Sequence, residues 1–234
     1  MIRAFLVAGG IDGAHYDIRY RNDLGAFYKL LVHVIGIPPH QVRVCHRDGG
    51  AGDLDDDGRL EHFLPATRPE LETGLRWLAE AGPEDLAILV ASNHGDPDGL
   101  CLWGAGEFLP PSAVQEMLTP CAATKLLVFG QCYAGRFASI ALDRTVICCA
   151  CEPDQPSYAH PDKNYDSFLY HLATALAGET PDGTPPNVPL ARTGPAHVAE
   201  AFRYAQESNR TPETPRLIDP LALAPTLDLR RFAR

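Results

Sequence analysis

LAILVASNHG at residues 86–95 and KLLVFGQCYAG at residues 125–135 are apolar runs that each lead into glycine and one reactive side chain. Continuous apolar runs of this length predict strands buried on both faces, as in parallel sheets covered by helices. Similar runs occupy residues 2–8, 41–45 and 145–150. Helical periodicity between the runs predicts an α/β protein, a three-layer α/β/α sandwich with a mainly parallel sheet.

Helices are predicted between the strands from apolar stripes and end signals. Thr67 and Glu70 have the spacing of a capping box, and Ser112 and Gln115 repeat it. Gly36 is placed to stop the first helix. The predicted helices cover residues 22–36, 67–82, 112–118, 133–142, 166–177 and 195–206.

Length and composition predict one domain over residues 1–234. The chain is long enough for one sizeable core, and its 45% hydrophobic content is that of an ordinary globular protein. Residues 179–195, rich in Pro and Gly, are expected to form a surface loop. Residues 221–234 are expected to form a peripheral tail.

The charge balance excludes several classes of partner. Thirty acidic residues against 20 Lys and Arg give a net charge of −10, which repels phosphate backbones and anionic membranes. The apolar stretch at residues 4–8 is too short for a signal-peptide core, and no run approaches a membrane span. We therefore expect a cytoplasmic protein with no nucleic-acid or membrane partner.

Two groups of residues raise the question of metal. Cys148, Cys149 and Cys151 are clustered, but tetrahedral zinc sites usually use two separated ligand pairs, and the apolar run favours buried free thiols. A zinc-binding regulatory protein is the alternative. Residues 53–58 resemble the start of a calcium loop, yet Leu64 stands where such a loop has Glu, which favours a solvated acidic turn.

His94 and Cys132 are the candidate reactive pair. Residues just beyond the carboxyl ends of neighbouring parallel strands converge on one crevice, so the two side chains are expected to face each other. An imidazole can take the thiol proton and later protonate a leaving amine. Cys132 also opens a predicted helix, whose N-terminus would favour a thiolate. Together with the flanking glycines, the pair predicts a cysteine-nucleophile hydrolase rather than two packed strand-end residues.

These blocks resemble the caspase–legumain (hemoglobinase) clan of cysteine peptidases, where an apolar block precedes His-Gly and another precedes Cys. FLVAGG at residues 5–10 and YDIRYRNDLGAFYKLLVHVIGIPPHQVRV at residues 16–44 are similar to the legumain-type family. SYA at residues 157–159 and TPRLIDP at residues 214–220 extend the likeness over most of the chain. The resemblance implies a caspase-hemoglobinase-like fold.

The resemblance also implies roles for individual residues. Cys132 would be the nucleophile and His94 its partner, with the backbone N–H groups of Gly95 and Cys132 forming an oxyanion hole. Asp17 falls where legumain-like enzymes have an Asn that orients the histidine. Arg19 matches the arginine that lines the primary specificity pocket of the clan, against the alternative of a surface salt bridge.

Further pocket residues are less clearly matched. Asp166 lies near the acidic wall of the family's pocket, although it could equally be the N-cap of the helix that follows. The family's acid or glutamine two places before the nucleophile is Gly130 here, and Gln131 beside it is a candidate substrate-binding residue. Asn93 stands where legumains have Asp before the catalytic histidine.

The sequence therefore predicts a cysteine endopeptidase that cleaves peptide bonds through an acyl-enzyme, after Asn or Asp. Its partner would be a peptide or protein substrate, and the chemistry requires no metal or organic cofactor. A peptide ligase or transpeptidase is a variant of the same chemistry, since an amine can intercept the acyl-enzyme. A catalytically silent caspase-like scaffold that binds partners is the alternative from another class.

Overall fold

A computed structural model describes residues 1–104, 106–186, 190 and 196–233 of the chain. Its central sheet has six strands in the order β11-β10-β9-β5-β1-β2, all parallel to their neighbours except β11. The strands are β1 (Ile2–Ala8), β2 (Val42–His46), β5 (Leu86–Ser92), β9 (Thr124–Phe129), β10 (Thr145–Cys149) and β11 (Arg216–Ile218). The ends predicted for the parallel strands differ from these by at most about one residue, because a strand buried on both faces appears in the sequence as a continuous apolar run. The half-buried β11 was not predicted.

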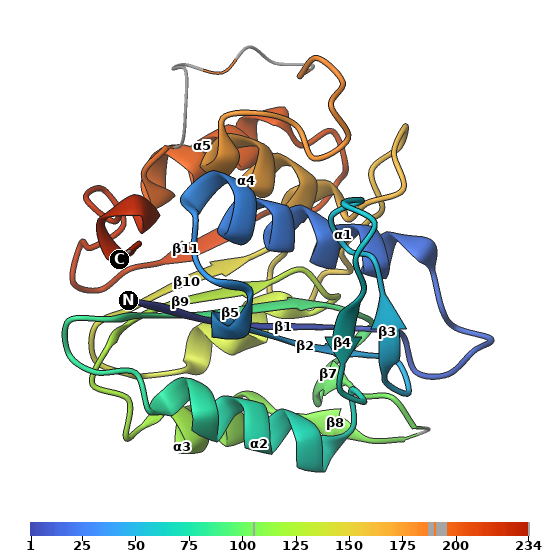
Figure 1. Ribbon diagram of the computed structural model, residues 1–234, viewed down its shortest axis with the longest axis horizontal. Coiled ribbons are helices and arrows are strands. Elements are labelled where there is room, and N and C mark those ends of the chain that lie inside the picture. The colour runs from blue at the N-terminus through green and yellow to red at the C-terminus, as the bar shows by residue number, and fades with distance from the viewer. Residues whose placement is uncertain (105, 187–189, 191–195, 234) are drawn as a thin grey trace.

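Helices cover both faces of the sheet, with α1, α4 and α5 on one side and α2 and α3 on the other (Figure 1). Side chains of each strand alternate between the two apolar layers: Leu6 packs in the α1, α4 and α5 layer, and Phe5 and Val7 in the other. The helices are α1 (Ile18–Lys29), α2 (Arg68–Ala79), α3 (Pro111–Leu118), α4 (Ser167–Ala177) and α5 (Val198–Ser208). The predicted α/β/α sandwich with a mainly parallel sheet is confirmed.

Several helix ends differ from the predictions. Neither predicted capping box forms, because Thr67 makes no side-chain cap bond and α3 begins after Pro110 rather than Ser112. α1 begins earlier than predicted, at Ile18, and continues into a π-helical turn, η1 (Leu30–Ile35), which ends at Gly36 with φ 84°. A left-handed residue of this kind is a common way to end a helix.

Two small sheets were not predicted. β3 (Gly50–Gly52) pairs with β4 (Glu61–Phe63) beside the β2 edge. β6 (Gly95–Asp96), β7 (Gly99–Cys101) and β8 (Phe108–Leu109) form a three-stranded sheet. Only Asn93 and His94 separate the end of β5 from the start of β6 at Gly95, so the main strand passes into this smaller sheet with a short interruption. Strands of two or three residues are too short to show a periodic pattern.

The segment expected to form a peripheral tail, of which residues 221–233 are described, lies largely at the surface but is anchored in the core by three side chains. Ala224, Leu227 and Leu229 are 0%, 5% and 3% exposed and belong to the apolar layer of α1, α4 and α5. Of the predicted loop at residues 179–195, residues 187–189 and 191–195 lie outside the described part. Within the described residues, none of the helices is both long and apolar enough to cross a membrane.

Candidate active site

The two candidate reactive residues leave the sheet at the same edge. β5 and β9 are hydrogen-bonded parallel neighbours, with Ala91 opposite Phe129. The N–H of Gly130 donates to the Ala91 carbonyl at 2.9 Å, which extends the pairing just past the end of β9. His94 and Cys132 therefore follow adjacent strand ends, as the sequence predicted from their positions.

Gly95 brings the two backbones into direct contact. A Cβ atom added to Gly95 would lie 2.0 Å from the carbonyl oxygen of Cys132 and 2.9 Å from its carbonyl carbon. Both obstructing atoms are backbone and cannot rotate away, so only glycine fits at this position. The His94-Gly95 turn and the Cys132 turn therefore form one packed unit.

The ring of His94 is held by a backbone carbonyl. Its Nε2 lies 2.9 Å from the carbonyl oxygen of His15, and the Tyr20 ring packs edge-on at 5.5 Å between centroids. A carbonyl oxygen can only accept, so Nε2 must carry the ring proton in this contact. In a neutral ring the lone pair is then on Nδ1, which leaves that nitrogen to act as the base.

Asn93 fixes the loop that supplies this carbonyl. Its Oδ1 accepts from the N–H of Gly10 at 2.6 Å and of His94 at 2.8 Å, and its Nδ2 donates to the carbonyls of Gly10 at 3.2 Å and Cys101 at 2.7 Å. Asn93 is 4% exposed, so these bonds are made in the interior. A carboxylate could not donate to the two carbonyls, which gives a physical reason for Asn at a position where legumains have Asp.

Asp17 does not contact the histidine as expected. It is exposed and caps α1, where its Oδ1 accepts from the N–H of Arg19 at 3.0 Å. Its Oδ2 lies 3.7 Å from Nε of Arg19. The contact expected of Asp17 is instead made by the carbonyl of His15, a backbone group that no residue pattern identifies.

Cys132 is the one cysteine of the seven that is not buried. The N–H of Ser157 points at its Sγ at 3.4 Å, and the Ser157 hydroxyl lies 3.8 Å away. The expected α-helix after Cys132 does not form: Tyr133 has φ 58°, and a six-residue 3₁₀ segment, η3 (Ala134–Ser139), follows. Polar support for a thiolate therefore comes from Ser157 and not from a helix N-terminus.

Arg19 lies among buried carboxyl groups. Its side chain is 19% exposed, and its Nη2 donates to the Tyr20 hydroxyl at 3.3 Å. Asp23, Asp166 and Glu213 are only 1%, 4% and 7% exposed, and all three interact electrostatically with Arg19. The arrangement places one fixed positive charge beside three acids drawn from α1, the start of α4 and the segment before β11.

Burial changes the acidity of these groups. Loss of solvent raises the pKa of Asp23 and of Glu213 to about 7, and it raises the pKa of Asp166 well above its usual range. The neighbouring acids add to the rise for Asp166. Because the folded state holds these protons more tightly than the unfolded state does, these groups lower the free energy of unfolding as pH rises from about 4 to about 7.

Asp166 and Glu213 differ in how far sequence could identify them. Asp166 is the N-cap of α4, with Oδ1 accepting from the N–H of Leu169 at 2.9 Å, and it is also one of the acids near Arg19. Its role in a substrate pocket stays a prediction. Glu213 accepts from the N–H of Tyr158 at 2.6 Å. It was missed, because its surroundings, TPETP, look like an ordinary turn.

Gln131 is fully buried and is not among the residues that interact with Arg19, so the structure does not support its assignment as a substrate-binding residue. It is 0% exposed, and its Cγ lies 2.8 Å from where a Gly95 Cβ would be. Neither Oε1 nor Nε2 has a hydrogen-bond partner in the described part of the chain. Gly130 faces α4 instead, where Leu169 would lie 2.4 Å from an added Cβ. Leu169 thus occupies the space that a side chain at position 130 would need.

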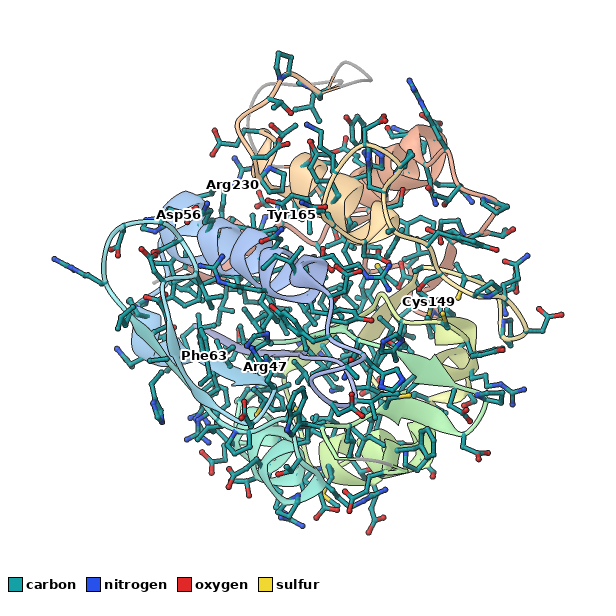
Figure 2. The ribbon with its side chains drawn as sticks, turned by 90° about the vertical axis from the view of Figure 1, so that its right-hand side faces the viewer. Arg47, Asp56, Phe63, Cys149, Tyr165 and Arg230 are labelled. Carbon is teal, nitrogen blue, oxygen red and sulfur yellow. The ribbon has the colours of Figure 1, made fainter. Side chains whose placement is uncertain are left out.

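The clustered cysteines cannot share a metal ion. Cys148 belongs to the apolar layer of α1, α4 and α5, whereas Cys149 and Cys151 belong to the opposite layer. All three are fully buried, and Cys149 is labelled in Figure 2. Burial raises the pKa of the Cys151 thiol to about 12, as expected of a packed thiol. Alternation along β10 therefore opposes the zinc-binding alternative.

The acidic turn brings three carboxylates together away from the His94 site. Oxygens of Asp53, Asp55 and Glu61 lie within 4.8 Å of one another. Each also has protein partners: Asp53 accepts from the N–H of Gly58 at 2.9 Å, and Asp55 lies 2.6 Å from Nε2 of His33. Such bonds are those of a turn closed by its own side chains.

Comparison with known proteins bears on the fold. No protein-family model matches the chain, and no curated protein matches its sequence. Among solved structures the chain is similar to caspase-1 from Spodoptera frugiperda, with a TM-score of 0.59 at 14% identity over 93% of this chain and 88% of that one. The chain has a caspase-like fold.

Proposed function

We propose that the protein is a cysteine peptidase in which Cys132 is the nucleophile and His94 the general base and acid. The observation that carries the proposal is the contact between Gly95 and the Cys132 backbone, which joins the two strand ends that bear these residues. The caspase-like fold and the motif order that resembles legumain-type peptidases both support it. A scaffold that only binds partners would not require His94, Gly95, Cys132 and Arg19 together.

The geometry is compatible with acyl transfer. Nδ1 of His94 would accept the thiol proton as Sγ of Cys132 attacks the peptide carbonyl, forming a C–S bond. The N–H groups of Gly95 and Cys132 are the candidate donors to the resulting oxyanion. Collapse breaks the C–N bond, and the imidazolium gives its proton to the leaving amine. Water, deprotonated by His94, then hydrolyses the thioester and restores the thiol.

Arg19 and the nearby acids support a preference for Asn, or for Asp, before the scissile bond. A guanidinium can bind a carboxylate or an amide oxygen, and a carboxylate can accept from an amide N–H. Glu213 would supply the acceptor that the family places two residues before the nucleophile and that Gly130 lacks. Interception of the acyl-enzyme by a peptide amine is the ligase variant of the same site.

Selective alkylation combined with peptide cleavage tests the proposal. At pH 7, iodoacetamide is expected to modify Cys132 at least about tenfold faster than any other cysteine, because the other six are buried and burial raises the pKa of Cys101 to about 11. The same treatment should abolish cleavage of a peptide library. Equal labelling rates, or a library left uncut by unmodified protein, would favour the scaffold. Mass spectrometry of products with an added amine peptide separates hydrolysis from ligation.

Arg19→Gln is expected to lower kcat/KM for peptides with Asn or Asp before the scissile bond by about 10- to 100-fold, mainly through KM. The reason is the loss of a charged donor in the pocket. Arg76→Gln is the matched control, since Arg76 is exposed and pairs with Glu72 on the surface of α2. A cleavage profile identical to that of the unmodified protein would contradict the role of Arg19 as a pocket residue.

A further inference from the structure

Asp23 is a buried acid that the reaction itself does not use. It lies on α1, one helical turn after Arg19, and is 1% exposed. Its Oδ2 accepts from the hydroxyl of Ser92 at 2.5 Å, and its Oδ1 accepts from the N–H of Asp166 at 3.0 Å. Burying a carboxyl group is costly unless it is hydrogen-bonded, and both oxygens of Asp23 have such partners.

One of its partners belongs to the strand end that bears the base. Ser92 is the last residue of β5, and the buried Asn93 and then His94 follow it directly. The bond from Ser92 to Asp23 therefore fixes the end of β5 to α1.

The other partner belongs to the segment that touches the nucleophile. Asp166 is bridged to Ala159 in antiparallel fashion, and the N–H of Ser167 donates to the carbonyl of Tyr158 at 3.0 Å. Ser157, at the start of this segment, has its N–H 3.4 Å from Sγ of Cys132. Asp23 is thus linked through Asp166 to the backbone that holds the thiol.

We infer that Asp23 is a positioning residue that sets the spacing between His94 and Cys132 by joining the end of β5 to the segment at residues 157–166. The inference rests on the proposed function. It assigns Asp23 no contact with substrate. Loss of its two bonds would leave the Ser92 hydroxyl and the Asp166 N–H buried without partners, and both strand-end turns would be free to shift. Misplacement of reacting groups by about 1 Å can cost about 100-fold in rate.

Two substitutions separate position from charge. Asp23→Ala removes both bonds and is expected to lower kcat by about 30- to 100-fold with little change in KM. Asp23→Asn loses the same charge but keeps an oxygen for the Asp166 N–H and an amide that can donate to Ser92, so kcat is expected within about threefold of the unmodified protein. Asp228→Asn, which alters a cap in the remote 3₁₀ segment η4 (Leu229–Phe232), is the control.

The outcomes are distinct. Full activity of Asp23→Ala would overturn the inference. An Asp23→Asn variant with kcat as low as that of Asp23→Ala would also overturn it, since the loss of charge would then explain the lower rate. If Asp23→Ala does not fold, Ser92→Ala removes a single bond and is expected to lower kcat about tenfold. The iodoacetamide rate of Cys132 is measured in every variant and needs no cleavage. If the unmodified protein cuts no peptide, the proposed function fails. The positioning role is then tested by the labelling rate alone: it is overturned if iodoacetamide modifies Cys132 in Asp23→Ala as fast as in the unmodified protein.

Discussion

Cys132→Ala is expected to lower kcat/KM on the best library peptide by about 10⁴-fold or more, because the acyl-enzyme cannot form without the thiol. The fold should survive. Cys132 is half-exposed and its Sγ makes only weak contacts with Ser157, so its removal leaves no large cavity. The measurement is initial-rate cleavage with circular dichroism and thermal unfolding of the same samples.

Cys121→Ala provides the matched control for this variant. Cys121 is buried between α3 and β9, and its Sγ lies 3.9 Å from the carbonyl of Leu78, away from the strand ends that carry the site. Its removal is expected to cost some stability and no activity. Retained cleavage by Cys132→Ala would refute Cys132 as the nucleophile, whatever the control shows.

Gly95→Ala is expected to lower kcat/KM by about 100- to 1,000-fold while the protein remains folded. A single methyl group would meet the Cys132 carbonyl oxygen at 2.0 Å, so one of the two turns must move. Either movement changes the path from His94 to Cys132 and displaces the backbone N–H groups proposed as oxyanion donors. The effect should appear in kcat more than in KM.

Gly82→Ala serves as the control for that substitution. Gly82 follows α2 at the opposite end of the sheet, and an added Cβ would come no closer than 3.4 Å, to Oδ2 of Asp85. Its activity should be unchanged. If Gly95→Ala cleaves peptides at the normal rate, the contact between Gly95 and the Cys132 backbone does not contribute to catalysis, and the proposed function loses its main support.

The parallel strands, and the positions of His94 and Cys132 just past adjacent strand ends, were predictable because each depends on a local pattern. A buried strand appears in sequence as an apolar run, and two such runs place the residues after them at one edge of the sheet. The arginine and the acid at the start of α4 came from resemblance to a family, and both lie together in the structure. Their joint role in binding substrate stays a prediction.

The parts that escaped prediction depend on contacts between distant segments. The His15 carbonyl on His94 is a backbone group, so no side-chain pattern marks it. Glu213 and Asp23 read as a turn residue and a helix residue until the fold buries them beside Arg19. The helix expected after Cys132 was wrong for the opposite reason, since local periodicity was outweighed by the left-handed turn at Tyr133.

The lateness of Glu213 in the chain has a consequence for biosynthesis. A ribosome completes the codons for His94 and Cys132 long before it reaches Glu213 and the buried Leu227 and Leu229. Domains generally fold as units during translation, at about 5–20 residues per second. A nascent chain that already contains its thiol therefore still lacks one of the acids near Arg19 and part of its core. The group of acids around Arg19 is complete only after residue 213 has been made.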